Sequence, residues 1–184
     1  FNEYILGNEK NCFRVNTIEE WKNKDEENYL PTIKYIITLD SDTNLVFNSG
    51  LELIGAMAHV LNRPIIDENK NIVINGYGIM QPRIGINLQS GNKSIYTKIF
   101  AGLPGTDLYA NAISDVYQDN FNEGIFTGKG IYDLKVFSQV LKNQIPENTV
   151  LSHDLLEGSY LRCGLVSDVV LLDDYPFRYN SNMS

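Results

Sequence analysis

Two aspartates one residue apart, Asp40 and Asp42, are the residues whose types and spacing most directly suggest chemistry. They follow an apolar run, Tyr35 to Leu39, that is typical of a buried strand. Ligands of α/β proteins gather at the carboxyl ends of strands, so we expect both carboxylates there, pointing to the same side of an extended segment. Their oxygens are what a hard divalent cation prefers. Acidic pairs are also common at solvated strand ends, so both interpretations stay open.

A second segment with chemical potential is Thr127-Gly128-Lys129-Gly130. Glycines on both sides of a lysine can bring backbone N–H groups and one ammonium to an anion. The segment is not a phosphate-binding P-loop, because the spaced upstream glycine and the Ser or Thr after the lysine are missing. An ordinary loop is the alternative interpretation.

A third segment starts at Ser152 and contains His153, Asp154 and Glu157. Ser152 is a suitable N-cap and Gly164 a suitable end for a helix between them. Asp154 and Glu157 would then lie in the first turn, where the helix dipole favours anions, and this is sufficient structural reason for both acids. His153 next to Asp154, where a strand-like run meets a helix, instead indicates charged groups that face a cleft.

The elements that must position these residues alternate between strands and helices, which predicts an α/β sheet. Ser49 and Glu52 have the spacing of a capping box, and the helix that follows is expected to run to about Asn62. The chain also predicts a hairpin around 67–70, a helix over 134–141 and a strand over 165–172. The apolar face of the first helix is assigned to Leu51, Ile54, Ala58 and Leu61. His59 in that helix is interpreted as a structural residue, since it has no partner with metal-ligand spacing.

Length and composition limit the function classes. A chain of 184 residues with 43% apolar residues is long enough for about one domain with its own core. We divide it into a peripheral lead-in, 1–31, and a core, 32–184. The net charge of −8 argues against nucleic acid, which is bound by clustered Lys and Arg. No segment approaches the roughly 20 apolar residues that span a bilayer, so the chain is expected to be soluble.

The order of these features resembles the glycosyltransferase domain of cyclic β-1,2-glucan synthases. The resemblance covers nearly the whole chain from about Ile33. It rests on long segments rather than one short motif: 37–43, 57–59, 76–83, 114–119, 126–132 and 146 onward.

The resemblance implies a GT-A-like fold, a mixed sheet flanked by helices, and inverting transfer of glucose from UDP-glucose to a growing glucan. It implies Mg²⁺ or Mn²⁺ held by Asp40 and Asp42 on the donor diphosphate, and Asp154 as the general base. Substrate contacts are expected from Thr127, Gly128, Lys129, His153, Glu157 and Gln81.

The resemblance also implies a larger parent protein. That parent is expected to lie in the bacterial inner membrane through spanning helices, to carry further carbohydrate-active domains, and to present this domain to the cytoplasm. The chain is expected to begin after the first nucleotide-binding strand and helix and to end before an Arg/Trp-rich motif. We therefore expect this fragment, truncated at both ends, to bind UDP-glucose poorly and turn it over little.

Three alternatives remain at this stage. The first is a non-catalytic glycan-binding or scaffold module with the same fold. The second is a phosphoryl-transfer domain with Asp40 as nucleophile, against which the Asp-Ser-Asp pairing argues. The third is a hydrolase that uses Asp40 and Asp154 as paired acids.

Overall fold

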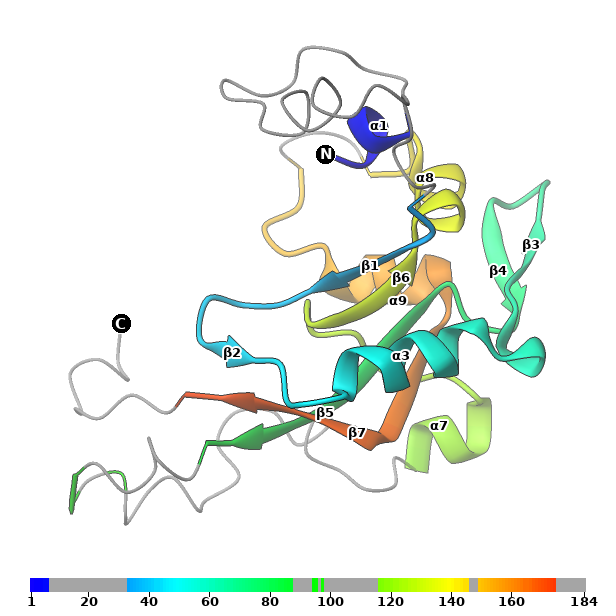
Figure 1. Cartoon of the computed structure of the whole chain (residues 1–184). Coiled ribbons are helices and arrows are strands. Elements are labelled where there is room, and N and C mark those ends of the chain that lie inside the picture. The colour runs from blue at the N-terminus through cyan, green and yellow to red at the C-terminus, as the bar shows by residue number, and fades with distance from the viewer. Residues whose placement is uncertain (7–32, 88–93, 96, 98–115, 146–148, 175–184) are drawn as a thin grey trace, which may run out of the picture.

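The computed structural model describes residues 1–6, 33–87, 94–95, 97, 116–145 and 149–174. These residues form a five-stranded mixed sheet with helices on both faces and a separate two-stranded hairpin (Figure 1). The strands are β1 (Tyr35–Thr38), β2 (Thr43–Asn44), β3 (Ile65–Asp67), β4 (Ile72–Asn75), β5 (Ile79–Ile86), β6 (Gly130–Asp133) and β7 (Cys163–Asp173). The helices are α1 (Asn2–Ile5), α3 (Ser49–Ala58), the 3₁₀ turn η1 (Val60–Asn62), α7 (Val116–Phe121), α8 (Leu134–Leu141) and α9 (Asp154–Leu161).

The sheet has the strand order β1-β6-β5-β7-β2. Its centre is the parallel pair of β5 and β7, the two longest strands. β6 is antiparallel to both β1 and β5, and β2 is antiparallel to β7. The predicted α/β class with a mixed sheet is therefore confirmed. One consequence decides where a site can form: the carboxyl ends of β1, β5 and β7 and the amino ends of β6 and β2 all lie at the same end of the sheet.

The core lies on both faces of the sheet because neighbouring residues of each strand point to opposite faces. Ile79 of β5 and its partner Tyr132 of β6 pack in the cluster that includes α8 and α9. The next pair, Met80 and Ile131, packs in the cluster below α3. Helices therefore cover both faces of the central strands.

Several sequence predictions are confirmed. The strand before Asp40 is β1, the hairpin is β3 and β4, the helix over 134–141 is α8, and the strand over 165–172 lies within β7. Asp133 accepts hydrogen bonds from the N–H groups of Lys135 and Val136, which explains why α8 begins directly after a strand. Of the lead-in 1–31, the structure describes only residues 1–6, which contain the short helix α1. None of the helices among the described residues is long and apolar enough to cross a membrane.

The prediction for α3 is wrong in its cap, its end and its buried face. Asn48, not Ser49, precedes the helix, and its side-chain amide donates to the carboxylate of Glu52. The helix ends at Ala58 because the backbone of His59 is extended. The buried residues of α3 include Leu53 and Met57, whereas the residues assigned to the apolar face, Leu51, Ile54, Ala58 and Leu61, are exposed. Apolar residues occur on both sides of this helix, so the spacing alone did not determine the buried side.

Truncation of Leu53 and of Leu51 tests which side of α3 is buried. Leu53 is fully buried between α3 and the sheet, so Leu53→Ala is expected to lower the free energy of unfolding by about 2–5 kcal/mol. Leu51 is 70% exposed, and Leu51→Ala is expected to change it by less than about 0.5 kcal/mol. Urea unfolding followed by circular dichroism measures both. A larger loss for Leu51→Ala than for Leu53→Ala would reverse the assignment of the buried face.

Candidate functional site

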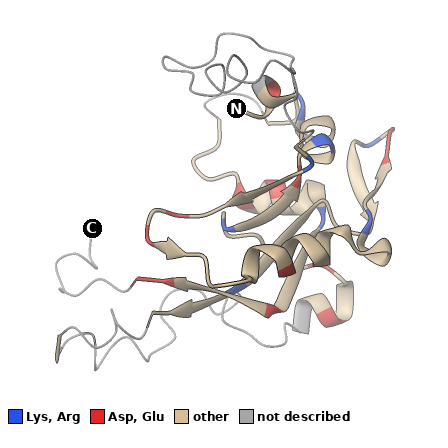
Figure 2. Cartoon of the chain, in the orientation of Figure 1, with Lys and Arg blue, Asp and Glu red and all other residues tan. Residues whose placement is uncertain are grey.

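Four segments bring charged and polar side chains together at the end of the sheet defined above. Asp40 follows β1, Thr43 begins β2, Lys129 precedes β6, and Asp173 is the last residue of β7. Figure 2 shows the acidic residues of the loop after β1 and of the end of β7 on the same side of the molecule. This is the end of an α/β sheet at which ligands gather. We call Asp40, Thr43, Lys129 and Asp173 the lysine cluster.

Lys129 is the centre of this cluster. Its Nζ lies 3.1 Å from Oδ2 of Asp40 and donates a short hydrogen bond to Oδ2 of Asp173. The lysine side chain is only 14% exposed, whereas that of Asp40 is 57% exposed. Partial burial lowers the pKa of Lys129, but the hydrogen bonds and charges of Asp173 and Asp40 outweigh it, so the pKa is raised above its ordinary value. The ammonium is therefore charged at physiological pH.

Asp40 and Asp42 lie in a turn, not in the extended segment that the sequence predicted. The N–H of Thr43 donates to the carbonyl oxygen of Asp40 (3.1 Å), and the carbonyl of Asp42 accepts from the N–H of Asp174 (3.0 Å). β1 ends two residues earlier, at Thr38. Both aspartate side chains are exposed, and Asp40 is the one that contacts Lys129.

Asp173 is the functional residue that the sequence analysis missed. Oδ1 of Asp173 accepts a hydrogen bond from the hydroxyl of Thr43 (2.6 Å), while Oδ2 contacts Lys129. Thr43 of the neighbouring strand β2 and Lys129 of the loop before β6 therefore hold one carboxylate oxygen each. An acidic residue directly after the long apolar run of β7 was the available signal, because it has the same form as Asp40 after β1.

The loop before Lys129 is fixed by Gln81 of β5. Gln81 is fully buried, and its Oε1 accepts from the N–H (3.0 Å) and from the hydroxyl (3.1 Å) of Thr127. Its Nε2 donates to the carbonyl of Pro82 (3.0 Å). Gln81 was predicted to contact substrate. The geometry instead places it behind Thr127 as a positioning residue.

Asp154 approaches the same loop from α9. Gly128 has φ +92°, and a Cβ at this position would lie 3.3 Å from Oδ2 of Asp154. A glycine is therefore favoured twice, by the left-handed backbone and by the nearby carboxylate. Asp154 therefore lies beside Gly128, and Asp40 lies beside the next residue of the same loop, Lys129.

His153 and Glu157 lie close to Asp154 at the start of α9. Nδ1 of His153 lies 3.2 Å from Oε1 of Glu157, one helical turn further on. Burial raises the pKa of Glu157; the charge of His153 opposes this change, and that of Asp154 adds to it. His153, not Ser152, takes the cap position, and the helix ends at Leu161, before the predicted stop at Gly164. Among the described residues, ligand atoms of His153, Asp154 and Glu157 lie within 4.8 Å of one another, close enough to share one cation.

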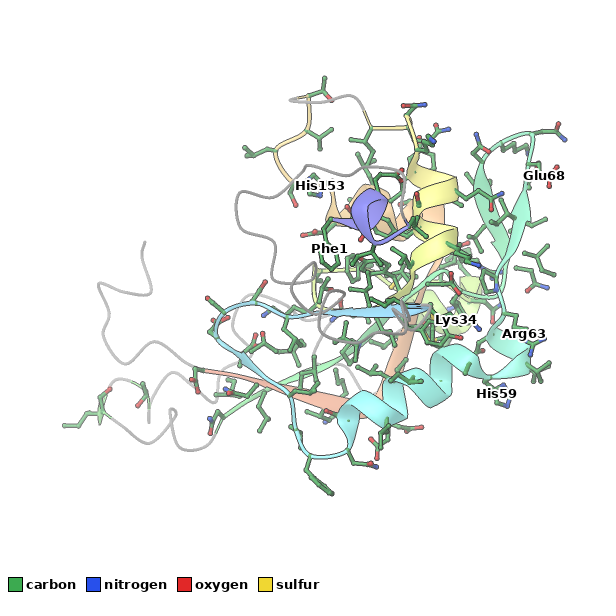
Figure 3. The ribbon with its side chains drawn as sticks, turned by 45° about the horizontal axis from the view of Figure 1, so that its top comes forward. Phe1, Lys34, His59, Arg63, Glu68 and His153 are labelled. Carbon is green, nitrogen blue, oxygen red and sulfur yellow. The ribbon has the colours of Figure 1, made fainter. Side chains whose placement is uncertain are left out.

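The two histidines of the chain lie far apart and have different roles. His59, at the end of α3, accepts from the N–H of Leu61 through Nδ1 and so caps η1. Figure 3 shows it on the opposite side of the molecule from His153. The structural interpretation of His59 is confirmed.

The fold and the site define an α/β domain with an acidic, lysine-bearing end of the sheet, in which carboxylates from several elements approach the loop before β6. The chain is 46% identical over 153 residues, 83% of its length, to the cyclic beta-(1,2)-glucan synthase NdvB of Rhizobium meliloti (strain 1021). It spans 5% of the length of that relative. The predicted resemblance to cyclic β-1,2-glucan synthases is therefore confirmed for one segment of such an enzyme. No family model matches the chain.

Replacement of Lys129 by methionine tests the lysine cluster. Lys129→Met leaves Asp40 and Asp173 without their shared cation, so the free energy of unfolding is expected to fall by about 1.5–3 kcal/mol at neutral pH. Because the pKa of Lys129 is raised by folding, this stabilisation is complete below the ordinary value of 10.5 and is lost as the pH rises through the higher folded value. Urea unfolding of both proteins from neutral to strongly alkaline pH measures the difference. A difference that disappears already below pH 9 to 10 would contradict the ion pairs.

Replacement of Gly128 by alanine tests the contact with Asp154. A Cβ at φ +92° is strained and meets the carboxylate, so Gly128→Ala is expected to cost about 1–3 kcal/mol of stability. The matched control is Gly55→Ala in α3, where a Cβ would meet nothing within 4 Å. That change should stabilise the protein by about 0.5–1 kcal/mol. Thermal unfolding distinguishes the two, and equal effects would remove the argument for Gly128.

Proposed function

We propose that the chain is part of a metal-dependent inverting glucosyltransferase domain of the GT-A type, which transfers glucose from UDP-glucose to a growing β-1,2-glucan. One observation supports this above the others. The chain is similar to a segment of a glucan synthase, and Asp40 contacts Lys129 while Asp154 lies against Gly128, two neighbouring residues of one loop. A transferase needs two such places, one for the donor diphosphate and one for the acceptor hydroxyl.

The residues present fit a divalent cation on the diphosphate. Mg²⁺ is usually held by one or two carboxylates together with substrate phosphates, not by a complete protein cage. Asp40 and Asp42 are exposed oxygen donors one residue apart, and the carboxylates of this region outnumber its ammonium, Lys129. In this proposal Asp40 and Asp42 hold Mg²⁺ or Mn²⁺. The bound cation supplies stabilisation of the charge that gathers on the departing diphosphate.

Asp154 has the role of general base in this proposal. The acceptor hydroxyl loses its proton as its oxygen forms the bond to the anomeric carbon, while the bond from that carbon to the diphosphate breaks. A carboxylate within hydrogen-bond reach of the hydroxyl accepts the proton. Asp154 faces the open side of Gly128, where no side chain separates it from the loop. His153 and Glu157 flank the same place and are proposed to contact the acceptor.

The parent protein is proposed to work at the cytoplasmic face of the bacterial inner membrane, with spanning helices and further carbohydrate-active domains outside this chain. This part of the proposal rests on the resemblance to cyclic β-1,2-glucan synthases.

A chimera tests the proposed function. The matching segment of the NdvB synthase is exchanged for this chain, and synthesis of β-1,2-glucan from UDP-glucose is measured in membranes. We expect the chimera to be active, and Asp154→Asn to lower its rate roughly 10²–10⁴-fold, the contribution of a general base. Asp168→Asn is the control, because Asp168 is an exposed aspartate in the middle of β7. Full activity of the Asp154→Asn chimera would refute the role of this residue.

A second measurement does not depend on turnover. Mn²⁺ binding to the chain in the presence of UDP is followed by electron paramagnetic resonance. Asp40→Asn and Asp42→Asn should each weaken binding, whereas Asp168→Asn should not. Unchanged Mn²⁺ binding in both site variants would remove the metal from the proposal.

A further inference from the structure

Two hollows lie near α9, beyond the residues proposed to act in transfer: one beside the helix itself and one at Arg162, the residue that follows it. The inner hollow, about 160 Å³, is lined by Glu123–Phe126 and by Leu155, Gly158 and Ser159 of α9. The outer hollow, about 320 Å³, is lined by Leu61, Asn62, Asn75, Gly76, Tyr77, Asn122 and Arg162. The outer one is of the size of small-molecule sites, which start at about 300 Å³.

The segment 122–128 runs along α9 in the opposite direction and joins the hollows to Asp154. At one end Gly128 lies against Asp154, in the middle Gly158 lies against Phe126, and at the other end Arg162 donates to the carbonyl of Asn122 (3.2 Å). Asp154 is the first residue of α9, and Arg162 directly follows its last residue. At about 1.5 Å per residue, the two are roughly 12 Å apart along the helix axis. The line of hollows therefore begins next to the proposed general base.

The outer hollow presents hydrogen-bonding groups without a net charge. The guanidinium of Arg162 is offset by Glu123, whose Oε1 lies 3.5 Å from Nε. The other lining side chains include three asparagine amides, which can both donate and accept. This combination suits a neutral ligand rich in hydroxyl groups and gives no preference for a phosphate.

The side chains of Arg162 and Asn75 are held in place by hydrogen bonds to the backbone. Nε of Arg162 is buried without a hydrogen bond, while its terminal nitrogens donate to the carbonyls of Ile74 and Asn122. Asn75 uses its Oδ1 for the N–H of Gly76, which leaves its amide donors available. Because Nε of Arg162 already faces the carboxylate of Glu123, the groups open to a ligand hydroxyl are the amide donors of the exposed Asn75.

The backbone around the outer hollow is also strained. Asn122 and Arg162 both have φ +56°. A bulky residue such as arginine is rare in this conformation, which costs about 1–3 kcal/mol and is found where function requires it. Here the strain directs the guanidinium of Arg162 across two chain segments, and so forms the wall of the hollow.

We infer that the two hollows form a track for the acceptor, in which a β-1,2-linked glucan lies along α9 with its growing end at Asp154. The inference rests on the proposed function and adds to it the path of the acceptor chain. The inner hollow holds the glucose units next to the reacting hydroxyl between Phe126 and Leu155. The outer hollow binds the hydroxyls of units further back through Asn75, Asn122 and Arg162.

The test is the dependence of binding on oligosaccharide length. Linear β-1,2-linked glucose oligomers, from the disaccharide to the hexasaccharide, are titrated into the ¹⁵N-labelled 184-residue chain by NMR. We expect longer oligomers to bind at least tenfold more tightly than the disaccharide and to shift the Nε–H signal of Arg162. In Asn122→Gly, which removes the amide but suits the backbone, the advantage of the longer oligomers should be lost.

Asn143→Gly is the matched control, since Asn143 is an exposed asparagine with φ +62° at the end of α8. It should bind like the unchanged chain. Binding that does not depend on length, or that is equally reduced in both variants, would overturn the track. Asn75→Asp gives a second check, because it keeps the acceptor for the N–H of Gly76 and removes the amide donors.

The outcome is separable from that of the proposed function. Asp40→Asn should leave oligomer binding unchanged, because Asp40 lies outside both hollows. Length-dependent binding together with an inactive chimera would keep the track and refute the transferase. An active chimera without oligomer binding along α9 would keep the transferase and refute the track.

Discussion

The ion pairs of Lys129 with Asp40 and Asp173 are the interaction on which the candidate site depends. They connect the end of β1, the start of β6 and the end of β7: Lys129 lies 44 residues before Asp173 in the sequence and further still after Asp40. Two carboxylates close together repel each other unless a cation lies between them. The lysine supplies that cation from the protein itself, so this end of the sheet can form without a bound metal.

This arrangement also determines what a divalent cation would have to displace. Asp173 is held by both Thr43 and Lys129, whereas Asp40 is the more exposed partner and contacts the lysine with one oxygen. If a cation binds Asp40, the ammonium can keep its contact with Asp173. Lys129 then remains near the cation and the diphosphate as a second positive charge, a role that suits an ammonium on a flexible stem.

The sequence was sufficient for the parts of the fold and the site that depend on local pattern. The strand before Asp40, the helix over 134–141 and the loop around Gly128 follow from apolar runs and glycines, whereas the cap of that helix at Asp133 was found only in the structure. Asp173 could not be assigned to the site in the same way, because its partners Thr43 and Lys129 are distant in the sequence. The buried face of α3 was misassigned because both sides of that helix carry apolar residues, and only the sheet below decides which is covered.

The segment 122–128 connects the proposed general base to the hollows along α9. Its ends, Asn122 and Gly128, both have positive φ, and the part between them belongs to no helix or strand. Gly124 donates to the carbonyl of Cys163 (2.6 Å), and Thr127 is fixed by buried Gln81. A segment fixed at several points to rigid strands can position ligand groups with little reorganisation. Both Asp154 and the hollows along α9 lie against it, so the same backbone sets the place of the proposed base and the path of the proposed acceptor.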